Sequence, residues 1–555
     1  MTSTFLLSTA KFALTLGLLA GIVAGPATAS DEEGIPVTDP LVKAKCASCH
    51  ASDERGNMQQ ISWERTTPEG WQEVLKRMIL VNGVKLTPAE ARSMVKYLST
   101  NHGLAPEEAR TVMYDAERRI HDETKMANEN LRGACAKCHA LARPLSWRRS
   151  LDDWKQLADT HLTRYKAQPN EEAVAFLAKT APLHTAEWTA WSARTRAANL
   201  TGRWLVNTYV PGRGKYYGEM KIDPAGDDEF NTSVHLTSIK DGSEIVRSGH
   251  SVVYAGYAWR GRSKGGGPAS STPADPADLA SEAREVMWVA PDQSKAEGRW
   301  FWGQYQEFGI DVKLQRPSSD VTLLAVDRSS MKAGSQANHI RLIADNVSAQ
   351  ASPADLNFGP GVSVRRIVSR TPGEVIAEVD VAADAQLGSR DVAFQHSVIP
   401  KAIAIYDRVD YVKVTPDSAL AAFGSQTRAR GYQQFEAIGY HRGADGRAHT
   451  ADDVELGPVD VTWSMEIFYA KEGSSTDFVG KVSDTGFFTP AADNPNNNYD
   501  TWMIATAKSE KDKNGKPLVG KAFLVVTVPT YTFEGRQYVR ELDRWVDDGP
   551  AQETK

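Results

Sequence analysis

The sequence has few cysteines, only four among 555 residues. So small a number excludes a compact extracellular scaffold held together by disulfides. The sequence also lacks an excess of basic residues: 64 Lys and Arg stand against 70 Asp and Glu, a net charge of −6. No positive field is therefore available to hold nucleic acid. Hydrophobic residues at 41% and charged residues at 24% exclude a disordered chain and a protein with many membrane spans.

Long apolar runs are missing too, except for one near the N-terminus. The stretch Phe12–Val23 follows Lys11, and Ala27-Thr28-Ala29 supplies small residues for cleavage before Ser30. About a dozen apolar residues are too few to span a bilayer comfortably. We expect residues 1–29 to be a signal peptide that is removed on export to the periplasm, with no membrane span in the mature protein.

All four cysteines fall into two copies of one pattern, C-x-x-C-H. The copies are Cys46-Ala47-Ser48-Cys49-His50 and Cys135-Ala136-Lys137-Cys138-His139. This spacing is the attachment signature of c-type haem, in which two thiols bind the haem covalently and the adjacent histidine ligates the iron. A thioredoxin-like redox pair or a zinc site is disfavoured, because each pair has its own histidine and no second knuckle is nearby. The sequence predicts two covalent haems.

The segments after the two haem motifs resemble each other. Each contains S-W-x-R-[ST], a second Trp (Trp71 or Trp154), and a candidate iron ligand seven residues after that Trp. Seven residues is two helical turns, so each Trp shares a helix face with its candidate ligand. The repeat predicts Met78 as the sixth ligand of the first haem and His161 as that of the second. Met78 could also be an ordinary core methionine, and other candidates within reach are Met58, Met94, His102, Met113, His121 and His184.

Two further expectations concern the haems. Arg65 and Arg149, from the S-W-x-R segments, could pair with haem propionates or be solvent-facing helix arginines. A His/Met iron has a higher potential than a bis-His iron. We therefore expect electrons to pass from the Cys135 haem to the Cys46 haem.

Composition changes near Leu200, from helical patterns to short alternating segments separated by Gly, Pro, Asn and Asp. The predicted fold class is an N-terminal α-helical dihaem cytochrome c domain, then an antiparallel β-barrel and two immunoglobulin-like sandwiches. The acidic loop Gly443–Asp453 suggests calcium, but an exposed hairpin loop is favoured because the EF-hand ligand order is missing. The predicted boundaries are 1–29 for the signal peptide, 30–199 for the dihaem domain, 200–318 for the barrel, and 319–410 and 411–555 for the sandwiches.

This order of segments resembles the haem-bearing alpha subunit of quinohaemoprotein amine dehydrogenases. The most specific marks are the duplicated haem motif with its S-W-x-R flank and the barrel sequence Gly256–Gly261. The resemblance implies a periplasmic enzyme that oxidises primary amines to aldehyde and ammonia. It also implies a heterotrimer with a beta-propeller subunit and a small gamma subunit that carries a cysteine tryptophylquinone.

The cysteine count agrees with that division of labour, because a cysteine-linked quinone needs a cysteine that is not already bound to haem. We therefore expect no catalytic residue on this chain and electron transfer from the partner's quinone through two haems. The expected acceptor is a small soluble redox protein, such as a cytochrome c or a blue copper protein. The alternatives are a stand-alone dihaem carrier, a peroxidase-like cytochrome, or a haem sensor with adhesion-type β-domains.

Overall fold

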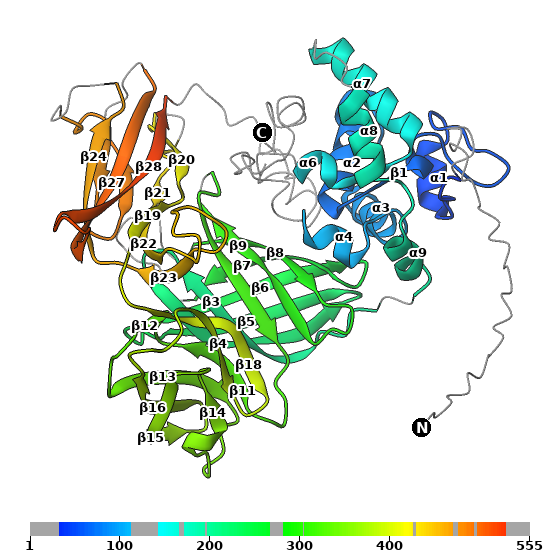
Figure 1. Ribbon diagram of the computed structural model, residues 1–555. Coiled ribbons are helices and arrows are strands. Elements are labelled where there is room, and N and C mark those ends of the chain that lie inside the picture. The colour runs from blue at the N-terminus through cyan, green and yellow to red at the C-terminus, as the bar shows by residue number, and fades with distance from the viewer. Residues whose placement is uncertain are drawn as a thin grey trace, which may run out of the picture.

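The computed structural model describes residues 33–112, 142–165, 171–194, 197–266, 281–303, 305–425, 429–469, 475–492 and 497–528. Along the chain, a region of short helices is followed by a closed barrel and two further β modules (Figure 1). The helical region lies at one side of the barrel, and the two β modules lie on its other side. No helix among the described residues is both long enough and apolar enough to cross a membrane.

Proline and threonine set the starts of the N-terminal helices. Proline occupies the first turn of α1 to α4, where its missing N–H is no loss. Thr67 and Thr87 cap α2 and α3 through their hydroxyl groups, and Gly83 ends α2 in a left-handed conformation. The helices are α1 (Pro40–Cys46), α2 (Pro68–Asn82), α3 (Pro88–Asn101), α4 (Pro106–Arg110), α6 (Ala142–Leu145), α7 (Leu151–Tyr165), α8 (Glu171–Thr180) and α9 (Ala186–Ser192).

The predicted fold class, a large helical cytochrome domain followed by β domains, was wrong. The described residues are mostly β, with 46% of them in strands and 19% in helices, and they contain no large N-terminal helical domain. The helices before residue 200 are short: α8, for example, ends at Thr180, and Pro182 cannot continue it. The arginines of the S-W-x-R segments do not lie on helices: Arg65 is in β1 (Glu64–Thr66), which follows the short 3-10 helix Ile61–Trp63, and Arg149 is in β2 (Trp147–Arg149). The two strands pair antiparallel.

Eight antiparallel strands close into a barrel in the order β10-β3-β4-β5-β6-β7-β8-β9. In β5, residues alternate between buried and exposed, so one face lines the interior. The interior contains Trp204, Trp259 and Trp300, each about 1% exposed. The strands are β3 (Gly202–Val210), β4 (Gly214–Gly226), β5 (Glu229–Ser238), β6 (Glu244–Tyr254), β7 (Ala258–Gly265), β8 (Ala283–Val289), β9 (Lys295–Trp302) and β10 (Phe308–Gln315).

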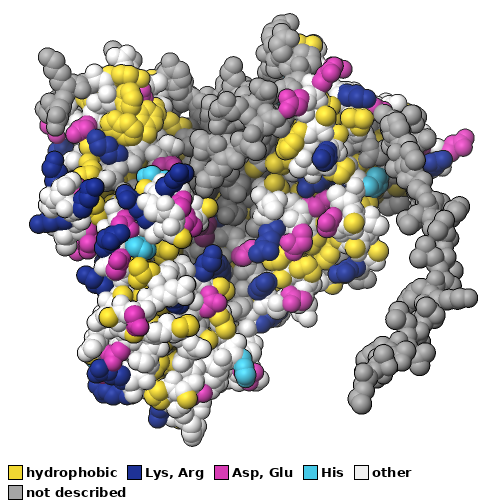
Figure 2. All heavy atoms as spheres, viewed as in Figure 1, with side chains coloured by type: hydrophobic (Ala, Val, Ile, Leu, Met, Phe, Trp, Pro, Cys, Tyr) yellow, Lys and Arg dark blue, Asp and Glu magenta, His cyan; other side chains and the backbone are white. Residues whose placement is uncertain are grey.

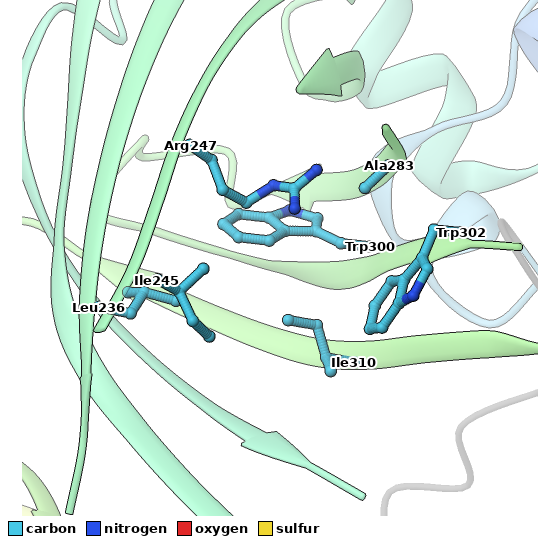
Figure 3. A pocket seen from close by; sticks show the side chains of 7 residues that line it. All are labelled: Leu236, Ile245, Arg247, Ala283, Trp300, Trp302 and Ile310. Carbon is cyan, nitrogen blue, oxygen red and sulfur yellow. The ribbon is translucent and has the colours of Figure 1, made fainter. Parts of the chain in front are cut away.

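Side chains fill the barrel almost completely. A small cavity of about 10 Å³ lies between the rings of Trp300 and Trp302 and the side chains of Ile245 and Ile310 (Figure 3). That volume is the least that holds one water molecule. At one end, the ring of Phe308 stacks on Trp302 and also on Phe487 of the C-terminal module. The described part of the barrel interior is thus densely packed.

The first β module after the barrel consists of two four-stranded sheets. Their orders are β11-β13-β16-β15 and β12-β18-β17-β14, and both sheets contribute to one hydrophobic core. The strands are β11 (Thr322–Val326), β12 (Ser330–Lys332), β13 (Asn338–Asp345), β14 (Leu356–Asn357), β15 (Val362–Thr371), β16 (Glu374–Val381), β17 (Gly388–Phe394) and β18 (Ser397–Tyr406).

The C-terminal module contains three sheets around a second core: β19-β22-β23, β20-β28-β27-β24 and β21-β26-β25. Hydrophobic side chains gather at its surface (Figure 2), where Phe468 and Tyr469 are 41% and 81% exposed. The strands are β19 (Tyr411–Thr415), β20 (Ser418–Ala422), β21 (Gln433–Gln434), β22 (Glu436–His441), β23 (Val454–Pro458), β24 (Val461–Ile467), β25 (Gly480–Val482), β26 (Phe487–Pro490), β27 (Tyr499–Lys511) and β28 (Pro517–Thr527).

Candidate functional site

The first haem motif forms a single compact turn at the end of α1. The backbone N–H groups of Cys49 and His50 both donate to the carbonyl of Cys46, at 3.1 and 2.9 Å. This turn brings the two thiols and the imidazole to one place. Both thiols are free: Cys46 is half-buried, Cys49 is exposed, and burial raises the pKa of Cys46.

The ring of His50 is oriented by the backbone that follows it. Its Nδ1 lies 2.9 Å from the carbonyl oxygen of Gln59, and that oxygen can only accept a hydrogen bond. The imidazole therefore carries its proton on Nδ1, which leaves the lone pair of Nε2 for a metal. A backbone carbonyl behind the ring is the usual outer partner of a metal-bound histidine. The residues of this turn fit a covalently held haem.

The second haem motif cannot be placed. Cys135, Cys138 and His139 lie outside the described residues, as do two of the alternative ligands, Met113 and His121.

The sixth-ligand candidates of the first half differ in accessibility. Met78 is half-buried on α2, and the amide of Asn82 donates to its sulfur at 3.6 Å. Met58 and Met94 are 0% and 1% exposed within the hydrophobic core. His102 is also fully buried, and neither of its ring nitrogens has a hydrogen-bond partner. Burial, followed by the charge of Arg65, lowers its pKa to about 3.

Apolar side chains remain exposed next to Met78. Leu80 and Val81, at the end of α2, are 70% and 72% exposed. The chain after α2 lies beside the first haem motif, because Lys45 donates to the carbonyl of Lys85 and pairs with Glu90 at 2.9 Å. An apolar surface next to a C-x-x-C-H turn is what a haem edge requires.

The second half repeats the construction of the first. Helices α2 and α7 are both 15 residues long. The indole of Trp71 donates to the carbonyl of His102 at 2.9 Å, and that of Trp154 donates to the carbonyl of Ala181 at 3.2 Å. Met78 and His161 thus occupy matching positions on matching helices. The Nδ1 of His161, which is half-buried, lies 2.9 Å from the carbonyl of Leu157. His184, outside this repeat, places Nε2 at 2.5 Å from the carbonyl of Glu33.

The arginines of the two S-W-x-R segments bind carboxylates of the protein. Arg65, which is 0% exposed, makes two hydrogen bonds to Glu108 at 2.8 and 3.1 Å. Arg148 also donates to Glu108, and Arg149 contacts both Glu64 and Asp153. Burial alone would raise the pKa of Glu108, but the two arginines lower it to about 2. These side chains join the two halves to each other, and neither Arg65 nor Arg149 faces solvent on a helix.

The helical region is fastened to the barrel by a second buried carboxylate. Glu69, in the first turn of α2, contacts the guanidinium groups of Arg260 on β7 and Arg284 on β8. The hydroxyl of Tyr257 donates to the carbonyl of Leu104 at 2.8 Å. One hydrophobic core runs from the helices into the barrel. The barrel sequence 256–261 is therefore an anchoring segment for the haem-motif region.

We expect this anchor to depend on pH. Burial opposes ionisation of Glu69, but Arg260 and Arg284 lower its pKa to about 2 from an ordinary value of 4.5. A carboxylate with a lowered pKa stabilises the folded state above about pH 4.5, and this contribution is lost as the pH falls towards 2. We expect calorimetry at pH 7 to show that Glu69→Gln lowers the free energy of unfolding by about 3 kcal/mol. The free energies of unfolding of the variant and the wild type should become equal near pH 2. A difference that does not change with pH would contradict the proposed role of the Glu69 carboxylate.

The acidic loop 443–453 forms a self-contained hairpin turn. Carboxylates of Asp445, Asp452 and Asp453 accept hydrogen bonds from backbone N–H groups and from the hydroxyl of Thr450. No group of His, Cys, Asp and Glu that could hold a metal ion is found in the described part of the chain.

Four family models match consecutive stretches of the sequence. Residues 37–180 match the haem-binding part of the quinohemoprotein amine dehydrogenase alpha subunit, and residues 197–317, 320–407 and 412–536 match its domains II, III and IV. The chain belongs to the alpha-subunit family of quinohemoprotein amine dehydrogenase. The helical region with both haem motifs is thus its haem-binding part, and the closed barrel is its domain II.

Other comparisons add nothing to this assignment. No curated protein matches the chain. A redesigned beta barrel bound to DFHBI is 18% identical and covers 22% of this chain and 100% of its own, with a TM-score of 0.18. Human protocadherin-24 EC1-2 is 14% identical and covers 38% of this chain and 98% of its own, with a TM-score of 0.16.

Sequence reasoning missed the two carboxylates that organise this alpha subunit, Glu69 and Glu108. Each lies in the first turn of a helix that begins with proline, a position where acidic residues are common for local reasons. Their partners lie about 40 to 215 residues away in sequence. No local pattern marks such pairs, so only the tertiary structure reveals them.

Proposed function

We propose that this chain is the electron-transfer subunit of a periplasmic amine dehydrogenase. It passes electrons from a quinone on a partner subunit, through two covalent c-type haems, to a soluble redox protein. The quinone is reduced when a primary amine is converted to aldehyde and ammonia. The observation that carries the proposal is the turn of Cys46, Cys49 and His50, with the imidazole fixed by Gln59, inside the haem-binding match.

The assignment of the ligands follows from this turn and from the repeat. Cys46 and Cys49 hold the first haem and His50 ligates its iron, while Cys135, Cys138 and His139 do the same for the second. Met78 is proposed as the sixth ligand of the first haem, because among the described methionines of this region it is half-buried while Met58 and Met94 fill the core. His161 is proposed for the second haem, because it holds the matching position on α7. A bound haem supplies one-electron transfer at its iron.

The family and the cysteine count support the partners that we propose. With four cysteines assigned to haem, the cysteine tryptophylquinone is placed on a small gamma subunit, and a beta-propeller subunit completes the heterotrimer. A signal peptide over residues 1–29 delivers the chain to the periplasm, where c-type haem is attached. The acceptor is a cytochrome c or a blue copper protein.

The decisive experiment is purification from the native host with every co-purifying chain. A haem-positive chain of this mass together with a small quinone-positive chain would support the proposal, as would reduction of the haems by added amine. A purified single chain that turns over peroxide without partners would contradict it and favour the peroxidase-like alternative.

Replacing the proposed sixth ligands should affect the two haems separately. Met78→Ala should abolish the far-red absorption band of sulfur-ligated ferric iron and lower the potential of one haem only, because the thioether favours ferrous iron. His161→Ala should leave that band in place and perturb the other haem. Met94→Leu, in the core, is the matched control and should change neither spectrum. Unchanged spectra in Met78→Ala would reject the ligand assignment.

A further inference from the structure

The two-stranded sheet between the repeat halves separates charges onto its two faces. Directly opposite residues of an antiparallel pair lie on the same face, and the register pairs Arg65 with Arg148 and Glu64 with Arg149. On the first face, the two arginines share the single carboxylate of Glu108. That face carries one excess positive charge.

The second face carries the opposite imbalance. Here one guanidinium, that of Arg149, contacts two carboxylates, Glu64 from β1 and Asp153 from α7. The side chains of Arg149, Glu64 and Asp153 are only 10%, 13% and 8% exposed. A buried excess negative charge is unfavourable, and one proton on the carboxyl pair removes it. Burial, followed by the charge of Glu64, raises the pKa of Asp153 to about 7.

Among the described residues, the other groups that contact the pair are not cations. The rings of Trp147 and Trp154 lie 4.5 and 5.7 Å from the guanidinium carbon of Arg149. From the segment after α8, the carbonyl of Ala181 accepts the backbone N–H of Arg149. On α7 itself, Asp152 is 61% exposed and pairs with Lys155 at the surface.

The pair also lies on the helix that carries a proposed iron ligand. Asp153 precedes His161 by eight residues on α7, which is about 12 Å along a helix axis. At that distance and an effective dielectric constant of about 20, one added charge changes a proton affinity by about tenfold.

We propose that the carboxyl pair Glu64–Asp153 takes up protons from solvent when the iron bound by His161 is reduced, and releases them on oxidation. This inference rests on the proposed function. With a tenfold change in proton affinity, up to about half a proton, taken from water, joins the pair for each electron that enters the iron, so the added negative charge is compensated in part. The partial exposure of both carboxyl groups gives the proton a route to solvent.

The test is redox titration of both haems in the assembled complex between pH 5 and 9. In the wild type, the potential of one haem should fall as the pH rises through about 7, because reduction raises the proton affinity of the pair. Asp153→Asn should flatten this dependence, and Glu64→Gln serves as the second variant where the first folds poorly. Asp152→Asn removes the same charge one residue away at the surface and should keep the wild-type slope.

Infrared difference spectra give an independent readout. Reduction should produce a carboxylic-acid C=O band in the wild type and in Asp152→Asn, and this band should be missing in Asp153→Asn. A flat wild-type potential, or a slope and band that survive in both Asp153→Asn and Glu64→Gln, would overturn the inference. The haem content and the reduction of the haems by amine are measured in the same preparations. A chain without covalent haem would contradict the proposed function. Intact haems whose potentials do not change with pH would contradict only this inference.

Discussion

Removal of the first haem motif is expected to stop electron delivery without dismantling the complex. Cys46→Ala combined with Cys49→Ala leaves no thiol for covalent attachment at this turn, so the chain should lose one haem and about 0.6 kDa of mass. Amine should still reduce the quinone, because that chemistry is placed on another subunit. Transfer to the external acceptor should fall sharply, because the first haem is the proposed exit. Mass spectrometry and stopped-flow spectroscopy measure the two effects.

A control within the same turn is available. Ser48 lies between the two cysteines and is exposed, so Ser48→Ala should keep both thioethers and a normal rate. A double variant that retains two covalent haems would reject the attachment at Cys46 and Cys49. A double variant that loses the haem but transfers electrons at the normal rate would instead show that the first haem is not the exit.

Glu108→Gln is expected to be among the most destabilising single substitutions in the helical region. It leaves Arg65, which is 0% exposed, and Arg148 without their shared carboxylate. Breaking a buried ion pair by removing one partner costs about 3 to 5 kcal/mol, because the remaining charge stays buried and uncompensated. The hydroxyl of Thr185 also donates to Glu108 at 2.7 Å, so the loss extends to the segment before α9. Calorimetry of the purified complex measures the shift.

The neighbouring residue provides the matched control. Glu107 on the same helix is 57% exposed, and Glu107→Gln makes the same chemical change at the surface. It should shift stability by less than about 0.5 kcal/mol. If the two substitutions lowered stability equally, the burial of Glu108 would not be the cause of the loss in Glu108→Gln.

These two carboxylates explain how the haem-binding part is held in place. Glu108 joins the two repeat halves, and Glu69 joins the first half to the barrel. In the described part of the chain, tryptophans and aliphatic residues, together with the buried Arg247 and Glu285, pack the barrel interior densely. The role of the barrel in this structure is to fix α2, and with it Met78, against a rigid support.

The sequence alone indicated the family, which the four family models confirm, and it predicted the haem-attachment residues. The residues of a C-x-x-C-H motif lie on one helical turn. The arrangement of Cys46, Cys49 and His50 is therefore encoded locally and can be predicted without knowledge of the tertiary structure. The positions at which helices begin are also encoded locally, because Pro68 and Pro88 suit the first turns of α2 and α3 for steric reasons. Alternating segments after residue 200 similarly indicated strands, which the structure arranges as a closed barrel and two modules.

Only the tertiary structure decided how these pieces meet. The segments around Arg65 and Arg149 were expected to be helical or to face propionates, but long-range pairing makes them strands whose guanidinium groups bind buried carboxylates. The division of charge between the two faces of that sheet depends on a register between residues 85 positions apart. Neither helical periodicity nor composition contains such information, because electrostatic partners are chosen by proximity in space. The large helical domain was wrongly predicted for the same reason. Local patterns indicate that helices form, but they do not give the lengths of the helices or the structure of the segments between them.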